Sequence, residues 1–284
     1  MQTVIWSESE KVVIGPGQPV VIIGERINPT GRRRLAAALE AGDMSLVQAE
    51  ALKQVQAGAA VLDVNVGVSG IDEPAVLVQA IQAVSQVSQT PLCLDSASPK
   101  ALEAGLAIYR GKALVNSVNG EEHKLKEVLP LVARHKAAVV ALTMDDSGIP
   151  KDVPTRLAIA EKIINEAAKL GIPPEDVVVD PLAMSVAADD QAGLAALTAM
   201  RQIRDHLGVN QTLGASNVSF GLPDRVSVNA VFLAMAVLMG CTCPITDPTV
   251  WEIRRALLIS DLMQGKDSFA MEFITAYRQQ HPED

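Results

Sequence analysis

Short apolar runs alternate with longer amphipathic segments along most of the chain. The runs are rich in Val, Ile and Leu and are nearly continuous, which is typical of strands buried on both faces of a parallel sheet. This pattern predicts eight parallel strands. They are Val20–Gly24, Ala60–Val66, Pro91–Asp95, Ala113–Asn116, Ala138–Met144, Val177–Asp180, Thr212–Ser216 and Cys243–Asp247.

Between the runs, apolar residues recur at spacings of three and four, which indicates amphipathic helices. Their start and stop signals agree with this reading. Ser98 precedes Pro99 as a helix N-cap, and Gly171 closes the helix that ends near Leu170. The predicted helices are Ser45–Ala57, Glu73–Val87, Pro99–Tyr109, Glu121–His135, Pro154–Leu170, Gln191–Leu207, Val226–Met239 and Thr249–Met263.

Eight strands that are each followed by a helix predict an α/β fold of the (β/α)8 TIM-barrel type, with about 33 residues per unit. A doubly wound open sheet is the alternative. That fold normally has five or six strands and a glycine-rich phosphate turn after the first. Neither Gly15–Gly17 nor Ile23–Arg26 matches the motif of that turn. We therefore expect residues 1–284 to form a single TIM-barrel domain.

Residues 1–17 precede the first predicted barrel strand. Two short β-prone runs, Thr3–Trp6 and Val12–Ile14, flank a polar turn and predict a β-hairpin. We expect this hairpin extension to cover the bottom of the barrel.

Composition narrows the class of protein. With 49% hydrophobic and 20% charged residues among 284, the chain is not intrinsically disordered. A net charge of −9 argues against a nucleic-acid partner. Three cysteines without a framework spacing predict reduced thiols and a cytoplasmic protein. The chain opens without a signal-peptide pattern, and no apolar run reaches membrane-span length, so we expect no membrane contact.

Every predicted strand ends in a carboxylate or a carboxamide. In a barrel these strand ends share one rim, where the chemistry of the fold is found. A single Asp or Asn at a strand end is more often a turn or cap residue. Eight in register are harder to explain in that way. The strand-end groups include Glu25, Asn28, Asp63, Asn65, Asp95, Asn116, Asp145, Asp180, Asn217 and Asp247.

The chemistry of this rim argues against a metal centre. The four histidines lie in helical or terminal segments, and no cysteine or histidine falls among the strand-end groups, so we expect no bound metal. Asp and Asn side chains offer hydrogen-bond acceptors and donors in one plane. They suit a flat neutral heterocycle with N–H, NH2 and C=O groups, such as a pterin.

Six short motifs occur in order at the ends of predicted strands. They are Gly24–Gly31, Leu62–Gly67, Leu94–Ser96, Val115–Ser117, Asp180–Leu182 and Gly214–Ser219. Together they resemble the motifs of the methyltetrahydrofolate:corrinoid protein methyltransferases, and the resemblance extends from Val20 to about Ala276. This family is related to the folate domain of cobalamin-dependent methionine synthase and, more distantly, to dihydropteroate synthase.

The resemblance implies a role for individual residues. It implies that Asp95, Asn116 and Asp180 hold the pterin ring, and that Asn217 is the catalytic residue, placed near N5 of the folate. Other rim positions match the family with less defined roles in substrate binding. These are Glu25, Asn28, Asp63, Asn65 and Gly214.

The resemblance also implies the activity and the partners. The chain would move a methyl group between N5 of tetrahydrofolate and cobalt, with tetrahydrofolate and 5-methyltetrahydrofolate as substrates. No cobalamin domain is present, so the cobalamin would be carried by a separate corrinoid protein. The sequence leaves the direction of transfer open. We further expect a homodimer that binds neither nucleic acid nor membranes.

Two other functions would use a similar rim, namely that of a dihydropteroate synthase and that of a non-catalytic folate-binding subunit. Dihydropteroate synthase usually shows Thr-Arg-Pro-Gly in its second loop, where this chain has Val66–Gly70. It also has Ser-Arg-Lys near strand seven, where this chain has Ser216–Ser219. A non-catalytic folate-binding subunit would have the same rim, and only a turnover assay separates it from an enzyme.

Overall fold

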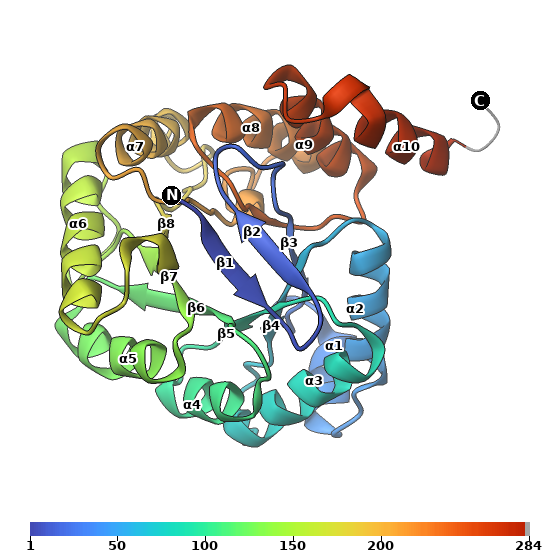
Figure 1. Ribbon diagram of the computed structural model, residues 1–284, viewed down its shortest axis with the longest axis vertical. Coiled ribbons are helices and arrows are strands. Elements are labelled where there is room, and N and C mark those ends of the chain that lie inside the picture. Colours follow the sequence, from blue (N-terminus) through green and yellow to red (C-terminus); the bar gives the residue numbers. More distant parts are fainter. Residues whose placement is uncertain (282–284) are drawn as a thin grey trace.

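A curled parallel sheet with helices on its outside forms most of the computed structural model (Figure 1), which describes residues 1–281. The sheet has the strand order β8-β7-β6-β5-β4-β3-β9. Its strands are β3 (Ile23–Ile27), β4 (Val61–Asn65), β5 (Leu92–Asp95), β6 (Leu114–Asn119), β7 (Ala138–Leu142), β8 (Val177–Asp180) and β9 (Ile245–Thr246).

The helices follow the strands along the chain. They are α1 (Arg33–Glu40), α2 (Ser45–Gln56), α3 (Glu73–Val87), α4 (Pro99–Ile108), α5 (Glu122–His135), α6 (Val153–Lys169), α7 (Ala192–His206), α8 (Arg225–Met239), α9 (Trp251–Met263) and α10 (Met271–Gln280). The predicted cap at Ser98 is present, since its side chain accepts from the Ala101 backbone N–H. No helix within residues 1–281 is long and apolar enough to cross a membrane.

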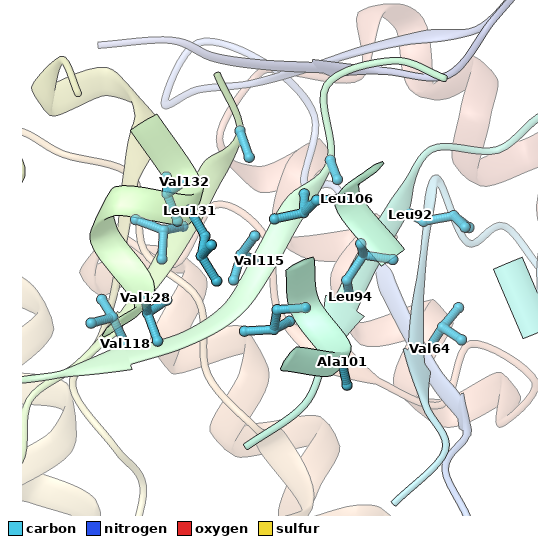
Figure 2. Packing of buried hydrophobic residues seen from close by; sticks show 14 of the residues in the cluster. Val64, Leu92, Leu94, Ala101, Leu106, Val115, Val118, Val128, Leu131 and Val132 are labelled. Atoms are coloured by element: carbon cyan, nitrogen blue, oxygen red, sulfur yellow. The ribbon is translucent and has the colours of Figure 1, made fainter. Parts of the chain in front are cut away.

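The two faces of the sheet belong to different apolar clusters, because successive side chains of a strand point in opposite directions. Residues such as Leu94 and Val115 face outward and pack against α4 and α5 (Figure 2). Val61, Cys93 and Leu114 face inward, where they belong to a second buried cluster. The continuous apolar runs therefore arise from strands that are covered on both faces.

The segment predicted as the seventh strand, Thr212–Ser216, is not a regular strand. Residues 210–214 form one isolated bridge to β8, Val179↔Gln211, and one to β9, Gly214↔Ile245. Thr212 explains part of the irregularity, because its hydroxyl donates to the Cys243 carbonyl oxygen at 2.6 Å. Such side-chain bonds compete with ladder formation. The sheet therefore contains seven of the eight predicted strands.

The N-terminal hairpin is present as β1 (Thr3–Trp6) paired antiparallel with β2 (Lys11–Ile14). Ile5 and Ile14 are fully buried in the inward-facing cluster. The Asn210 side-chain amide, at the start of the segment that bridges β8 and β9, donates to the Ile14 carbonyl oxygen at 3.0 Å. The hairpin thus covers the ends at which the parallel strands begin, as predicted, and in Figure 1 it lies across the ring of strands.

The first sheet strand runs later than predicted. The sequence pattern ends it at Gly24, whereas β3 extends to Ile27 and includes Glu25 and Arg26. The backbone N–H of Arg26 donates to the Gln54 side-chain oxygen at 2.8 Å, and the pairing with β4 is irregular between Gly24 and Ile27. Glu25 therefore lies within a strand and not in the loop after it.

Candidate functional site

Three polar side chains lie side by side where β4, β5 and β6 approach their carboxyl ends. Asn65 is paired in register with Asp95, and Asp95 with Asn116. All three share the strand face of inward-pointing residues, because they are two positions beyond Asp63, Cys93 and Leu114 respectively. The Asn65 amide donates to Asp95 at 2.9 Å. These residues form one layer at the mouth of the curled sheet.

Asp63 lies one layer deeper than these three residues. It is paired with Cys93, and its side chain is almost fully buried, with 2% of the residue exposed. The Asn116 amide donates to its carboxyl oxygen at 3.2 Å. Asp63 also hydrogen-bonds Asp95, and the pKa of both carboxyl groups is raised by burial. The structure therefore joins four of the predicted site residues into one hydrogen-bonded group.

Asp180 ends β8 on another part of the same rim. Burial raises its pKa to about 7, although hydrogen bonds from the Leu182 and Gly214 backbone and the charge of Arg156 act in the opposite direction. The Leu182 N–H donates to its carboxylate at 2.7 Å. Gly214 thus contributes a backbone donor, which gives this predicted position a physical role.

Arg156 is a supporting residue that the sequence pattern did not reveal. It lies on α6 and is nevertheless only 2% exposed. Its guanidinium donates to the Pro181 and Leu182 carbonyl oxygens at 2.8 and 2.9 Å, and to Pro150 at 2.8 Å. It therefore fixes the loop that follows Asp180. Nothing in its sequence surroundings separates it from a surface helical arginine.

Asn217 ends a single 3₁₀ turn, Ala215–Asn217, and is exposed. Within the described chain its side-chain amide has no hydrogen-bond partner. A Cβ atom added at Gly214 would lie 3.1 Å from the Asn217 Nδ2 atom, so the amide lies directly over the glycine. The Asn217 amide is therefore free to bond a ligand, and Gly214 leaves room for it.

Glu25 lies between charges of both signs. Burial and the nearby Asp247 carboxylate raise its pKa to about 7, while Arg26 and Arg225 act to lower it. Arg26 forms an ion pair with Asp247, with 3.2 Å between Nε and Oδ2. A carboxyl group with a pKa near neutrality at the rim can exchange a proton with a bound substrate. The sequence pointed to Glu25 by its place at the end of the first predicted strand and in a motif, and neither signal indicated its raised pKa.

Asn28 has a local structural role. Its side-chain oxygen accepts from the Thr30 backbone N–H at 2.9 Å, which forms a turn just after β3. Among the described residues it makes no hydrogen bond to the group around Asp95. The structure therefore does not join it to the other predicted site residues.

Metal-ligating chemistry has no cluster to support it in residues 1–281. In that range no group of three or more His, Cys, Asp and Glu side chains could hold a metal ion. The three cysteines are buried free thiols, and burial raises the pKa of each of them. What the rim offers instead is a set of carboxylates and amides near the carboxyl ends of the parallel strands.

The sequence matches a known family over this same region. Residues 24–247 match the model of the family described as pterin binding enzyme. A curated relative, the methylcorrinoid:tetrahydrofolate methyltransferase of Eubacterium limosum, is 31% identical over 266 residues, which cover 92% of this chain and 97% of the relative. The methionine synthase of Mycobacterium tuberculosis is 34% identical over 227 residues, but these cover only 19% of that longer protein.

Solved structures of dihydropteroate synthases share the fold. The enzyme from Xanthomonas albilineans aligns with a TM-score of 0.70 at 20% identity, over 93% of this chain and 99% of that chain. The enzyme from Thermus thermophilus aligns with a TM-score of 0.68 at 23% identity, over 92% and 99%. At these identities the likeness concerns the fold alone. Because the family model matches residues 24–247 and the Eubacterium limosum relative aligns over 92% of the chain, this chain belongs to the pterin-binding enzymes, and within them it is a relative of the methylcorrinoid:tetrahydrofolate methyltransferases.

Proposed function

We propose that this chain transfers a methyl group between N5 of tetrahydrofolate and the cobalt of a separate corrinoid protein. The observation that carries this proposal is the match to the Eubacterium limosum methyltransferase over nearly the whole of both chains. The rim of carboxylates and amides supports it, because these groups suit a pterin ring. Tetrahydrofolate or its 5-methyl form is one substrate, and the methylated or free corrinoid is the other.

Asp95, Asn116 and Asp180 are assigned to bind the pterin ring. Asp95 and Asn116 are adjacent in register, so they can bond neighbouring atoms of one ring edge. The Asp180 carboxyl lies at the end of β8 beside the Gly214 N–H. Carboxylate and carbonyl oxygens of this kind can accept hydrogen bonds from the N–H and NH2 donors of a pterin ring. Glu25 and Asn28 are assigned to the rim of the same pocket.

Asn217 is assigned to hydrogen-bond N5, the nitrogen atom that carries the transferred methyl group. A tertiary amine is a poor leaving group, so N5 must be protonated before the methyl group leaves. An amide cannot supply that proton, but its carbonyl oxygen can accept from the protonated N5. Because N5 is neutral in bound 5-methyltetrahydrofolate and carries positive charge in the transition state, the hydrogen bond is stronger in the transition state than in that neutral ground state.

The second substrate must approach from outside the chain. The corrinoid supplies a cobalt centre that exchanges the methyl group, and it is carried by a partner protein in this proposal. The exposure of Asn217 supports such an approach, because the reacting methyl group must come within near-attack distance of cobalt. The same residues serve both directions of transfer.

A direct assay tests the proposal. The purified chain is mixed anaerobically with 5-methyltetrahydrofolate and cob(I)alamin, and the absorbance change to methylcobalamin is followed. Tetrahydrofolate and methylcobalamin test the reverse direction. We expect turnover in at least one direction. Formation of dihydropteroate without methyl transfer would identify a synthase, and folate binding without turnover with free or protein-bound corrinoid would identify a carrier.

We also propose that the chain forms a homodimer through α7 and α8. An apolar groove of about 550 Å³ lies between these helices, lined by residues that include Leu197, Val228 and Met235. Leu194 and Val231, which also line the groove, are 64% and 63% exposed. Monomeric proteins rarely expose contiguous apolar patches larger than a few hundred Å². A second copy of the same face would bury these side chains.

Charge on this face should dissociate the dimer. We expect Leu194→Lys combined with Val231→Lys to convert a species of twice the chain mass into one of single mass, as measured by light scattering. Leu170→Lys, at the exposed end of α6, is the matched control and should leave the mass unchanged. A wild-type protein of single mass at micromolar concentration would contradict the proposed dimer.

We propose that residues 210–214 act as a short eighth strand that closes a (β/α)8 barrel, since they bridge both β8 and β9. The whole chain would then be one domain. Three buried free thiols favour a reducing compartment, and we assign the enzyme to the cytoplasm.

A further inference from the structure

Asp63 is too deep in the fold to share the role of its neighbours. It lies in the same inward layer as Cys93 and Leu114, one layer below Asn65, Asp95 and Asn116. A ligand that rests on the mouth layer meets those three residues before it reaches Asp63. A buried carboxyl group in this position must be explained by its contacts with protein.

Those contacts place Asp63 between two residues assigned to the pterin. The Asn116 amide nitrogen donates to the Asp63 Oδ1 atom at 3.2 Å. The Cys93 thiol donates to the same carboxyl group, and Asp63 and Asp95 are hydrogen-bonded to each other. Two carboxyl groups can hydrogen-bond only when one of them carries a proton.

The surroundings decide which of the two carries it. Burial and the Asp95 charge raise the pKa of Asp63 well above its usual range, and Glu25 on β3 adds to this effect. The pKa of Asp95 is raised by burial and by Glu73 of α3, but hydrogen bonds from Asn65 and Asp63 lower it. Asp63 is only 2% exposed, whereas Asp95 is partly exposed, so burial favours the neutral, protonated form of Asp63 over that of Asp95.

We propose that Asp63 is a positioning residue that keeps its proton, donates it in a hydrogen bond to Asp95 and accepts from Asn116, and so orients both residues toward the substrate. This inference rests on the proposed function. With its nitrogen bonded to Asp63, Asn116 presents its carbonyl oxygen to the ligand. Asp95 presents a carboxylate oxygen. The two neighbouring groups are then both acceptors.

Two adjacent acceptors select a ring edge that carries two donors. A 2-amino-4-oxo pterin offers a ring N–H and an exocyclic NH2 group on neighbouring atoms, whereas a 2-oxo analogue replaces the NH2 group with an acceptor. A site that is built to bond a donor strongly rejects an analogue that lacks it, because its acceptor is left unpaired. In this inference Asp63 sets the preference of the site for the 2-amino ring.

Substitutions at Asp63 test whether its carboxyl group is protonated or charged in the folded protein. In Asp63→Asn the amide can donate to Asp95 and accept from Asn116, so it reproduces the protonated acid. We expect folate affinity close to that of the wild type, and the same preference for a 2-amino over a 2-oxo pterin. Asp63→Ala removes both bonds and should weaken folate binding by roughly 10- to 100-fold.

Calorimetry with tetrahydrofolate, measured between pH 6 and pH 9, gives the readout. The affinity profiles of the wild type and Asp63→Asn should superimpose, because in this proposal Asp63 keeps its proton and the Asn side chain reproduces the protonated acid. The proposal would be overturned if the wild-type affinity showed a change with pH that is absent in Asp63→Asn. An equal loss of affinity in Asp63→Asn and Asp63→Ala would also overturn it. Wild-type affinity in Asp63→Ala would also overturn it.

Matched controls exclude a general defect. Cys93→Ala removes the thiol that donates to the same carboxyl group and should leave the pterin preference unchanged. Thermal unfolding identifies a variant that fails to fold. If Asp63→Ala does not fold, the pH profile of folate affinity in Asp63→Asn tests the proposal without it. If the wild-type protein binds no folate, the proposed function fails, whereas a defect confined to the Asp63 variants concerns this inference alone.

Discussion

Asn217→Ala should lower the single-turnover rate of methyl transfer by roughly 10- to 1,000-fold, the scale of one preorganised polar contact. The amide faces N5 in the proposed function, and its hydrogen bond is strongest when N5 is charged. Folate affinity should fall much less. Stopped-flow spectra of cob(I)alamin and methylcobalamin report the rate, and calorimetry reports the affinity.

The structure makes Asn217 a clean position for this experiment. Its side chain is exposed and has no hydrogen-bond partner in residues 1–281, so truncation leaves no buried group unsatisfied. Asn217→Asp keeps an acceptor oxygen and is the conservative control, which we expect to transfer methyl faster than the alanine variant. Transfer by Asn217→Ala at the wild-type rate, with folate and corrinoid saturating, would remove Asn217 from the mechanism.

Asp180→Ala should weaken tetrahydrofolate binding by about 1.5–3 kcal/mol, or roughly 10- to 150-fold, as for a lost hydrogen bond to a charged group. Asp95→Ala should have an effect of the same scale. Asp176→Ala is the control for β8, since Asp176 precedes the opposite end of that strand and pairs with Lys112 at 2.5 Å. It should leave folate affinity unchanged. Unchanged affinity in both Asp180→Ala and Asp95→Ala would contradict the assigned pterin pocket.

The raised pKa of Asp180 adds a pH dependence with a definite sign. The ionised carboxylate is the better acceptor, so wild-type folate affinity should rise as pH increases through about 7. Stability should change in the opposite direction. The folded-state pKa lies above the unfolded value of about 3.9, so the native protein holds the proton more tightly and loses stability as pH rises.

Chemical denaturation measures this loss. Relative to Asp180→Asn, the free energy of unfolding of the wild type should fall by on the order of 2–3 kcal/mol between pH 5 and pH 8. A difference between the two proteins that does not vary with pH would show that Asp180 titrates normally.

Sequence patterns predicted most of the sheet because its strands are apolar on both faces. β5, β7 and β8 lie within the runs expected for them, with Asp95 and Asp180 at two of the strand ends. The end of β3 was missed because Glu25 and Arg26 are polar and lie where the pairing with β4 is irregular, whereas the pairing resumes at Ile27. A polar interruption in an apolar run therefore does not always end a strand.

The candidate site was predictable as a set of positions but not as a network. The motifs selected Asp63, Asp95 and Asn116, yet they gave no sign that Asp63 bonds the other two. That relation depends on the register between β4, β5 and β6, which no single strand encodes. The helices α1 and α10 were also missed. Both helices are short and present few buried apolar residues, which are Leu35 and Leu39 in α1 and Ala276 in α10.

The isolated bridges around residues 210–214 divide the sheet into a continuous part and an interrupted part. Asp95 and Asn116 lie on the continuous part, whereas Asn217 follows the interrupted one. Backbone amides in short, irregular pairing open more readily and exchange their hydrogens with solvent faster than those of central strands. Motions that displace the reacting amide can therefore occur while Asp95 and Asn116 stay in place, so substitutions beside the interrupted segment should change turnover more than they change folate affinity.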